Sequence, residues 1–248
     1  MNDFFKRLVA HRGYMERFPE NSWCGIKAAL EKGTRWVEFD IQMYQPGKFI
    51  LLHDADLQRT ANTTLSVFDL TESQLRQVSI HEPDRLGDRY NPEYLISLED
   101  ILAKLATFPL ARAMVEIKEE SLAHWDLESV MQPLLAILNR FKAQCVLISF
   151  SLEALNYARD NSDIEIGWVL RSYSDENINQ ASKLKPEYLI CNHNKLPDNK
   201  PPAAGTWHWM LYDITDPLLA SQWVSRGIDM IETRDIGTLI DLSRSNRM

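Results

Sequence analysis

Short apolar runs alternate along the chain with longer stretches of amphipathic pattern. Nine runs rich in β-branched and aromatic residues are predicted to be strands: 7–11, 35–41, 49–53, 111–118, 145–150, 164–170, 187–191, 208–214 and 228–233. Helical spacing of apolar positions is found in the stretches 22–33, 98–108, 127–141, 151–160 and 216–227. Repeated alternation of strand and helix predicts a mainly parallel sheet with helical crossovers.

The spacing of the second and third predicted strands distinguishes them from the others. Only residues 42–48 separate them, whereas a parallel crossover needs a dozen or more residues. We therefore predict a hairpin with Pro46 and Gly47 at its tip, in which His53 pairs with Asp40 and shares its face. The other eight strands predict an α/β fold, a (β/α)8 TIM barrel with an extra β-hairpin arm after the second strand.

The domain organisation follows from length and from one unusual segment. A chain of 248 residues without a repeat or linker predicts a single TIM-barrel domain over residues 1–248. Residues 54–92 fit no barrel helix, because they are polar and contain Pro83, Gly87 and Pro92. We expect an inserted loop or small cap there.

Charge and cysteine content narrow the class of protein. A net charge of −8 without any basic run argues against a nucleic-acid surface or an anionic lipid surface. Cys24, Cys145 and Cys191 are widely spaced, which indicates neither a disulfide framework nor a zinc site. The first residues lack a leader-like pattern and the apolar runs are too short to span a bilayer, so we expect a cytoplasmic protein without stable membrane insertion.

Ionisable residues interrupt several of these apolar strands near their ends. His11 ends the first strand, Glu38 and Asp40 are two residues apart in the second, and Glu116 and Lys118 repeat that spacing further on. A period of two places the members of each pair on one face. Side chains at the carboxyl ends of barrel strands converge on one mouth. The residues expected to meet there are His11, Glu38, Asp40, His53, Glu116 and Lys118.

Three converging carboxylates repel one another by on the order of several kcal/mol in a partly buried site. A hard divalent cation such as Mg2+ or Ca2+, which prefers oxygen ligands, would neutralise them. The alternative is a network of salt bridges with Arg12 and Lys118 in place of a metal. The two histidines in the same mouth favour the metal. A cation beside Arg12 and Lys118 would receive a phosphate, and His11 and His53 would then suit acid–base cleavage of a phosphodiester.

Several short motifs together resemble the glycerophosphodiester phosphodiesterase family, which belongs to the same broad barrel group as the phosphoinositide-specific phospholipases C. The resemblance extends from about residue 7 to about residue 240. The motifs are "AHRG" at 10–13, "PENS" at 19–22, "VEFD" at 37–40, "LLHDADLQRT" at 51–60, "VEIK" at 115–118, "SF" at 149–150, "LYDITDP" at 211–217 and "RGIDMIET" at 226–233.

The resemblance implies a role for each matching position. It implies one divalent cation, Mg2+ or Ca2+, on Glu38, Asp40 and Glu116, acid–base roles for His11 and His53, and phosphate contacts from Arg12 and Lys118. The implied substrates are small glycerophosphodiesters such as glycerophosphocholine and glycerophosphoethanolamine. The implied products are glycerol 3-phosphate and a free alcohol.

Two residues of the "PENS" motif have more than one plausible role. Glu20 and Asn21 match positions that would contact the substrate or brace Arg12. Asn21 also suits the start of the helix that follows it.

Aromatic residues near later strand ends extend the predicted site. Phe150, Trp168, Trp209 and Tyr212 could form a wall around the alcohol half of the substrate, or could belong to the barrel core. For Trp209 the core is favoured.

Some features leave the prediction open. Arg234 stands where the family often has Asp or Asn, so the last strand departs from the family pattern at the mouth. Other candidate functions are a phospholipase acting on lysolipids and a catalytically silent protein that binds a phosphate ligand. The sequence is silent on the oligomeric state.

Overall fold

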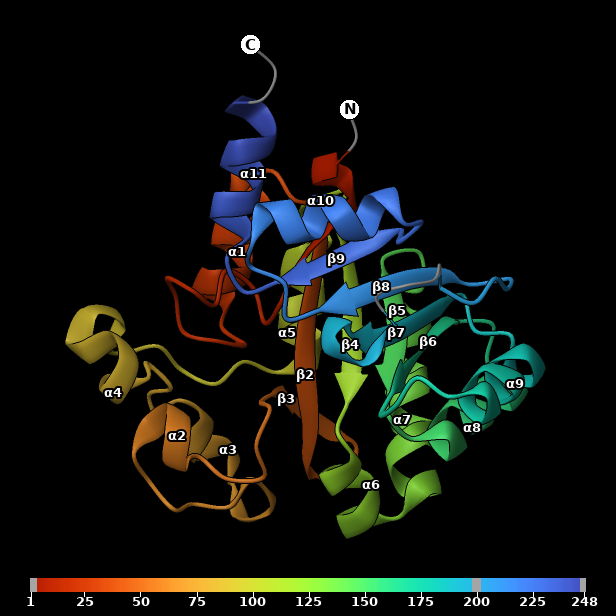
Figure 1. The fold of residues 1–248 in the computed structure, drawn as a ribbon. Helices are drawn as coiled ribbons and strands as arrows, with labels where there is room; N and C mark the ends of the chain where they lie inside the picture. The colour runs from red at the N-terminus through yellow and green to blue at the C-terminus, as the bar shows by residue number, and fades with distance from the viewer. Residues whose placement is uncertain (1–3, 198–201, 246–248) are drawn as a thin grey trace.

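Eight parallel strands close into a barrel in the computed structural model, which describes residues 4–197 and 202–245 (Figure 1). The strand order is β1-β9-β8-β7-β6-β5-β4-β2, and pairing of β1 with β2 closes the ring. The ring consists of β1 (Leu8–Ala10), β2 (Trp36–Gln45), β4 (Arg112–Ile117), β5 (Cys145–Ser149), β6 (Glu165–Leu170), β7 (Tyr188–Asn192), β8 (His208–Tyr212) and β9 (Met230–Thr233). The predicted (β/α)8 barrel is therefore confirmed. The predicted domain of 1–248 also includes short segments outside the described residues.

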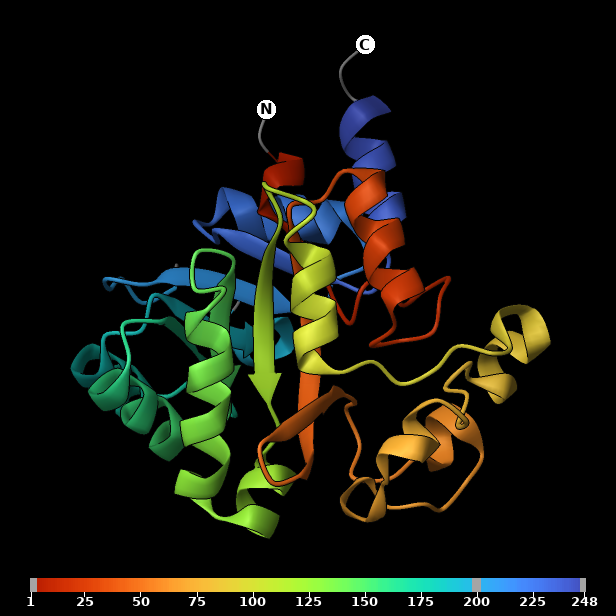
Figure 2. The same ribbon diagram turned by 180° about the vertical axis from the view of Figure 1, so that it is seen from behind.

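Helices surround the barrel and cover the outer face of its strands (Figure 2). They are α1 (Trp23–Lys32), α5 (Leu98–Leu105), α6 (Glu119–Trp125), α7 (Leu127–Asn139), α8 (Leu152–Asn161), α9 (Asp175–Leu184), α10 (Pro217–Ser225) and α11 (Ile236–Ser245). Helix α1 begins where the Ser22 hydroxyl accepts a hydrogen bond from the Gly25 amide, and it ends at Gly33 with φ 113°. Within the described part of the chain, no helix is both long and apolar enough to cross a bilayer.

The predicted hairpin is present, but its register differs from the prediction by one residue. Strand β3 (Lys48–Leu51) pairs antiparallel with β2 outside the ring. Gln45 pairs with Lys48 across the tip, as predicted, but an irregularity at Tyr44 shifts the ladder, so that Ile41 pairs with Leu51. The predicted pairing of Asp40 with His53 is therefore wrong, because His53 lies beyond the end of β3.

Residues 54–92 form a small unit beside the barrel, at the lower left of Figure 1. Their helical turns are α2 (Gln58–Ala61), Val67–Asp69, α3 (Glu72–Leu75), α4 (Pro83–Leu86) and Gly87–Tyr90. Leu57, Val67 and Ile80 of this unit form a buried cluster with Ile50 of β3 and with Leu52, which follows that strand. The extra strand β3 thus gives the inserted segment an apolar surface on which to pack.

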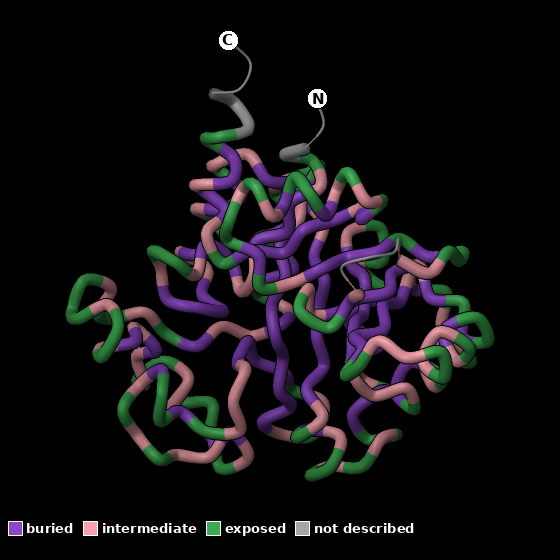
Figure 3. Tube along the Cα trace, in the orientation of Figure 1, coloured by how far each residue is buried: buried purple, intermediate pink, exposed green. Residues whose placement is uncertain are grey.

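Alternation along each strand separates two layers of apolar side chains. One set faces the surrounding helices and forms the large outer core, which includes Val37, Phe39 and Ile41 of β2. The other set fills the barrel interior and consists of Val9, Met114, Val146, Ile148, Val169, Tyr188, Ile190, Met210 and Met230. The barrel strands are accordingly buried along most of their length (Figure 3). Because apolar side chains fill the barrel interior, the ionisable residues of the predicted site lie at the mouth of the barrel.

Candidate active site

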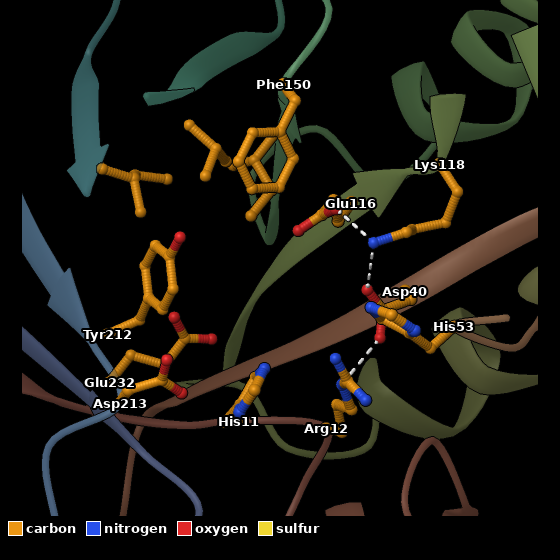
Figure 4. A pocket seen from close by; sticks show the side chains of 13 residues that line it. His11, Arg12, Asp40, His53, Glu116, Lys118, Phe150, Tyr212, Asp213 and Glu232 are labelled. Carbon is orange, nitrogen blue, oxygen red and sulfur yellow. Dashed lines mark hydrogen bonds and ion pairs between the residues drawn. The ribbon is translucent and has the colours of Figure 1, made fainter. Parts of the chain in front are cut away.

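Five of the six predicted mouth residues line one cavity at the carboxyl end of the barrel (Figure 4), and the sixth, Glu38, lies beside it. The cavity has a volume of about 250 Å³. It is lined by His11, Arg12, Asp40, His53, Glu116, Lys118, Ile148, Phe150, Val169, Ile190, Tyr212, Asp213 and Glu232. Sequence reasoning thus brought together the correct ends of β1, β2 and β4.

Three buried carboxylates form a compact group beside this cavity. Glu38, Asp40 and Glu116 each offer an oxygen within 4.8 Å of the others, and the three residues are 2%, 1% and 9% exposed. Oε1 of Glu38 is buried without a hydrogen-bond partner among the described residues. Burial, reinforced by the charge of Asp40, raises the pKa of Glu116 to about 7 and the pKa of Glu38 well above its usual value.

Arg12 and Lys118 form ion pairs with two of these three carboxylates. Nε of Arg12 lies 3.0 Å from Oδ2 of Asp40, and Nζ of Lys118 lies 3.3 Å from Oδ1 of Asp40. Lys118 also donates to Oε1 of Glu116 at 2.8 Å. Burial would raise the pKa of Asp40, but the two cations outweigh it and hold this pKa well below its usual range. The predicted salt bridges therefore exist.

The salt bridges leave Glu38 without an ion pair to Arg or Lys among the described residues. Its contacts are the Arg12 amide, which donates to Oε2 at 3.0 Å, and His11, whose Nε2 lies 3.9 Å from Oε2. A buried carboxylate with a free oxygen, in an all-oxygen group, fits a hard divalent cation. The residues present are therefore suited to the predicted metal.

Glu20 and Asn21 lie behind the cavity and hold its charged groups in place. Nδ2 of Asn21 donates to Oδ2 of Asp40, and Oδ1 of Asn21 accepts from the Asp40 amide, both at 3.0 Å. Nη1 of Arg12 donates to Oε1 of Glu20 at 3.0 Å. Their geometry is that of braces rather than of residues facing the cavity. The alternative role of Asn21 at the helix start is wrong, because Ser22 caps α1.

His53 is oriented by a chain of polar contacts that reaches the barrel. Its Nδ1 lies 2.7 Å from Oδ1 of Asp54, whose Oδ2 accepts from Nε of Arg59 at 2.8 Å. Arg59 also donates to both carboxylate oxygens of Glu20, at 2.5 and 2.8 Å. Because Glu20 also binds Arg12, the inserted segment and the first strand hold the two sides of the cavity together.

His11 is held in a different environment. Its side chain is 19% exposed and lies beside Arg12, and both partial burial and this positive charge lower its pKa to about 3. The imidazole is therefore neutral at pH 7 and has a lone pair available on one nitrogen.

The aromatic predictions are partly corrected by the strand alternation. Phe150 and Tyr212 line the cavity. Trp168 does not, because it faces the outer core while its neighbour Val169 faces the interior. The indole of Trp168 donates to the Phe150 carbonyl at 3.4 Å. Trp209 belongs to the outer core, as favoured.

The structure adds residues that the sequence prediction missed. Glu232 of β9 lines the cavity while remaining 4% exposed, and burial together with Glu116 raises its pKa to about 8. The sequence could have indicated Glu232 in the same way as Glu38, because both are acidic residues inside an apolar strand. Asp54 and Arg59 belong to the "LLHDADLQRT" motif at 51–60, but no strand periodicity indicated their role, because they lie in the irregular insertion. Arg234 instead pairs with Glu16 on the surface, with Nε 3.1 Å from Oε2.

A closed (β/α)8 barrel with paired histidines, cations and carboxylates at its mouth defines a barrel enzyme whose site suits a phosphate ester. Residues 11–199 match the model of the "Glycerophosphoryl diester phosphodiesterase family". The chain belongs to this family and is a phosphodiesterase that hydrolyses glycerophosphodiesters.

Individual relatives support this placement. The glycerophosphodiester phosphodiesterase of Caldanaerobacter subterraneus is 22% identical over 243 residues, which cover 96% of this chain and 97% of the relative. Human glycerophosphodiester phosphodiesterase 1 is 32% identical over 96 residues, which cover 39% of this chain and 29% of the relative.

Solved structures share the fold. An Oleispira antarctica phosphodiesterase, solved in complex with the product sn-glycerol-3-phosphate, has a TM-score of 0.83 at 20% identity and 96% coverage of both chains. A putative glycerophosphoryl diester phosphodiesterase of Silicibacter pomeroyi has a TM-score of 0.80 at 19% identity, covering 95% of this chain and 93% of its own.

Proposed function

We propose that this chain hydrolyses glycerophosphodiesters to glycerol 3-phosphate and a free alcohol at the cavity of Figure 4. The observation that carries the proposal is the convergence of two histidines, two cations and the carboxylates of Asp40 and Glu116 on one cavity, with Glu38 beside them. The substrate is a small molecule that enters from the mouth of the barrel.

Glu38, Asp40 and Glu116 would hold the divalent cation, Mg2+ or Ca2+, of this reaction. When bound, the cation supplies positive charge that offsets the charge developing on the phosphate. Arg12 and Lys118 add two fixed positive charges at the same wall and bind the phosphate oxygens. Asn21 and Glu20 keep Asp40 and Arg12 in place for this purpose.

His11 and His53 transfer the protons. One imidazole accepts the proton of the attacking hydroxyl, and the other donates a proton to the oxygen of the departing alcohol as its bond to phosphorus breaks. Asp54 fixes the His53 ring through Nδ1, which leaves Nε2 for proton transfer. Over the complete hydrolysis, water supplies the hydroxyl to phosphorus and the proton to the alcohol.

Phe150 and Tyr212 give the cavity an aromatic lining, and in Figure 4 Tyr212 lies across the cavity from Lys118. This arrangement suits a substrate with a charged phosphate at one end and an alcohol at the other. The polar mouth favours deacylated substrates over lysolipids, whose long acyl chain would need an apolar route.

The test measures release of glycerol 3-phosphate from glycerophosphocholine and glycerophosphoethanolamine. Wild-type activity is expected with Mg2+ or Ca2+ and is expected to be abolished by a chelator. His11→Ala is expected to lower kcat by about 10²–10⁴-fold, the usual contribution of an acid–base group. His208→Ala, at an exposed ring outside the cavity, is the matched control and should retain activity.

Two results would overturn this proposal. Activity that survives both chelation and His11→Ala would remove the mechanism. Tight binding of glycerophosphodiesters by correctly folded protein, without turnover under any metal, would identify a catalytically silent binding protein.

A further inference from the structure

A second group of potential metal ligands lies next to the carboxylate triad and has a different composition. His11, Glu38 and Glu232 each offer one ligand atom, and these atoms lie within 4.8 Å of one another. The three residues come from β1, β2 and β9, which are neighbours in the ring, or directly follow them. Adjacent strands thus deliver one nitrogen and two carboxylates to one point.

The two carboxylates of this group lack strong partners. Oε1 of Glu38 is buried without a hydrogen bond among the described residues. The Glu232 carboxylate, from a residue only 4% exposed, makes no hydrogen bond or ion pair with any residue that the structure describes. In Figure 4 it lies across the cavity from Lys118. Burying an ionised carboxylate that has no hydrogen bond or ion pair costs free energy, and a bound cation reduces this cost.

The available cations are already engaged elsewhere. Arg12 pairs with Asp40 and Glu20, and Lys118 pairs with Asp40 and Glu116. Neither forms an ion pair with Glu232. No Arg or Lys side chain that the structure describes therefore pairs with Glu232, and its carboxylate is available to a bound cation.

We propose that His11, Glu38 and Glu232 form a second cation site that takes a nitrogen-accepting divalent metal, with Zn2+ as the best match. Zn2+ accepts His and carboxylate ligands, whereas Mg2+ and Ca2+ prefer the all-oxygen group of Glu38, Asp40 and Glu116. Donor atoms around a tetrahedral zinc lie about 3.3 Å apart, so the cluster closes around the ion by side-chain shifts of about 1 Å. Glu38, with two carboxylate oxygens, belongs to both groups.

Occupation of this second site inhibits the enzyme, an inference that rests on the proposed role of His11 as a proton-transfer group. The ring nitrogen that ligates a metal donates its lone pair to that metal and can no longer accept a proton. Zn2+ and productive catalysis therefore exclude each other at His11, even while Mg2+ occupies the first group.

The binding test counts zinc on the folded protein. In saturating Mg2+, equilibrium dialysis against zinc chloride is expected to show one zinc per chain in the wild type. Glu232→Gln should weaken this binding at least tenfold, whereas Asp213→Asn, which removes a charge from the same cavity wall, should retain it. A zinc-soaked wild-type crystal provides a measurement without any variant, since an anomalous peak is expected among His11, Glu38 and Glu232.

The inhibition test compares each variant with its own activity in Mg2+ alone. Zinc should inhibit the wild type and Asp213→Asn equally, and the concentration for half inhibition should rise at least tenfold in Glu232→Gln. Equal zinc binding and inhibition in all three proteins, or an anomalous peak only among Glu38, Asp40 and Glu116, would overturn the second site. Full activity of His11→Ala would instead overturn the proposed role of His11, and the zinc count would still decide whether the site exists.

Discussion

At the scale of single residues, Glu20 shows how a buried carboxylate can serve the site without facing the cavity. It accepts hydrogen bonds from Arg12 and from Arg59, although its own side chain is almost fully buried. Burial raises its pKa, but the hydrogen bonds from Arg59 and the charge of Arg12 outweigh burial, so the net pKa is lowered. Glu20 is therefore charged in the folded protein and joins the inserted segment to the first strand.

This lowered pKa predicts a pH-dependent contribution to stability. The contribution of Glu20 should be complete above its ordinary pKa of 4.5 and should be lost as the pH falls through the lower pKa of the folded state. Glu20→Gln is expected to lower the free energy of unfolding by about 2 kcal/mol at pH 7, because it removes the charge that accepts hydrogen bonds from both Arg12 and Arg59, although Arg12 keeps its pair with Asp40 and Arg59 keeps its pair with Asp54. Urea unfolding at pH 7 and pH 3.5 measures the difference, which should shrink at the lower pH.

The control for this prediction is Glu72→Gln. Glu72 pairs with Lys48 on the surface, so its replacement should change the unfolding free energy little at either pH. A loss in Glu20→Gln that is the same at both pH values would contradict the assignment of a charged Glu20.

At the scale of elements, the link between β1 and α1 is what aims His11 and Arg12. Arg12 and Gly13 adopt positive φ, 51° and 82°, so the chain turns sharply as it leaves the strand. The turn packs on the backbone of α1, since a Cβ atom on Gly13 would lie 2.7 Å from the Gly25 carbonyl carbon and from the Ile26 amide. Helix α1 thus holds the site residues through backbone contact rather than through side chains.

Gly13→Ala should therefore damage both stability and activity. The new methyl group meets backbone atoms that cannot rotate away, and the residue is strained at positive φ, so we expect a loss of about 3 kcal/mol in the free energy of unfolding. Displacement of Arg12 should also lower kcat for release of glycerol 3-phosphate.

The matched control is Gly87→Ala in the inserted segment. Gly87 also has positive φ, 58°, with ψ −150°, but a Cβ atom added there would have no other atom within 4 Å, so only backbone strain of about 2 kcal/mol is expected. Equal losses in the two variants would show that strain alone, and not the contact with α1, explains the effect of Gly13→Ala.

At the scale of the whole molecule, the barrel concentrates negative charge at its mouth. Glu38, Asp40, Glu116 and Glu232 are all buried there, in a chain whose net charge is −8. Arg12 and Lys118 offset only part of this charge. The apo fold therefore carries an electrostatic cost that a bound divalent cation would relieve.

Divalent cations are expected to raise the melting temperature. At 100 times Kd, a cation that binds only the folded state stabilises it by about 2.7 kcal/mol. For a chain of this size, that corresponds to a rise of about 5–10 °C. Calorimetry with MgCl2 or CaCl2 measures the rise, which should be absent in Glu116→Gln.

Sodium chloride at matched ionic strength is the control, because general screening should not reproduce the effect. A rise in Glu116→Gln as large as in the wild type would exclude Glu116 as a ligand.

Strand and helix identities were largely readable from local pattern, but their exact placement was not. The hairpin between β2 and β3 was predicted from a short connection, yet the irregularity at Tyr44 shifted its register. Helices α6, α9 and α11 were not predicted. The sequence placed Trp168 and Val169 in one strand, but it could not predict which of the two faces the barrel interior.

The sequence by itself determined the class of fold and most of the site, because strand periodicity and parallel topology together place the residues that end each strand at a common mouth. Only the tertiary structure decided which face of each strand points inward, how Arg59 and Asp54 reach His53, and that Glu232 joins His11 and Glu38. The physical reason is that a period of two fixes which residues share a face. The choice of that face, and the register between strands, depends on pairing and packing between segments far apart in the chain.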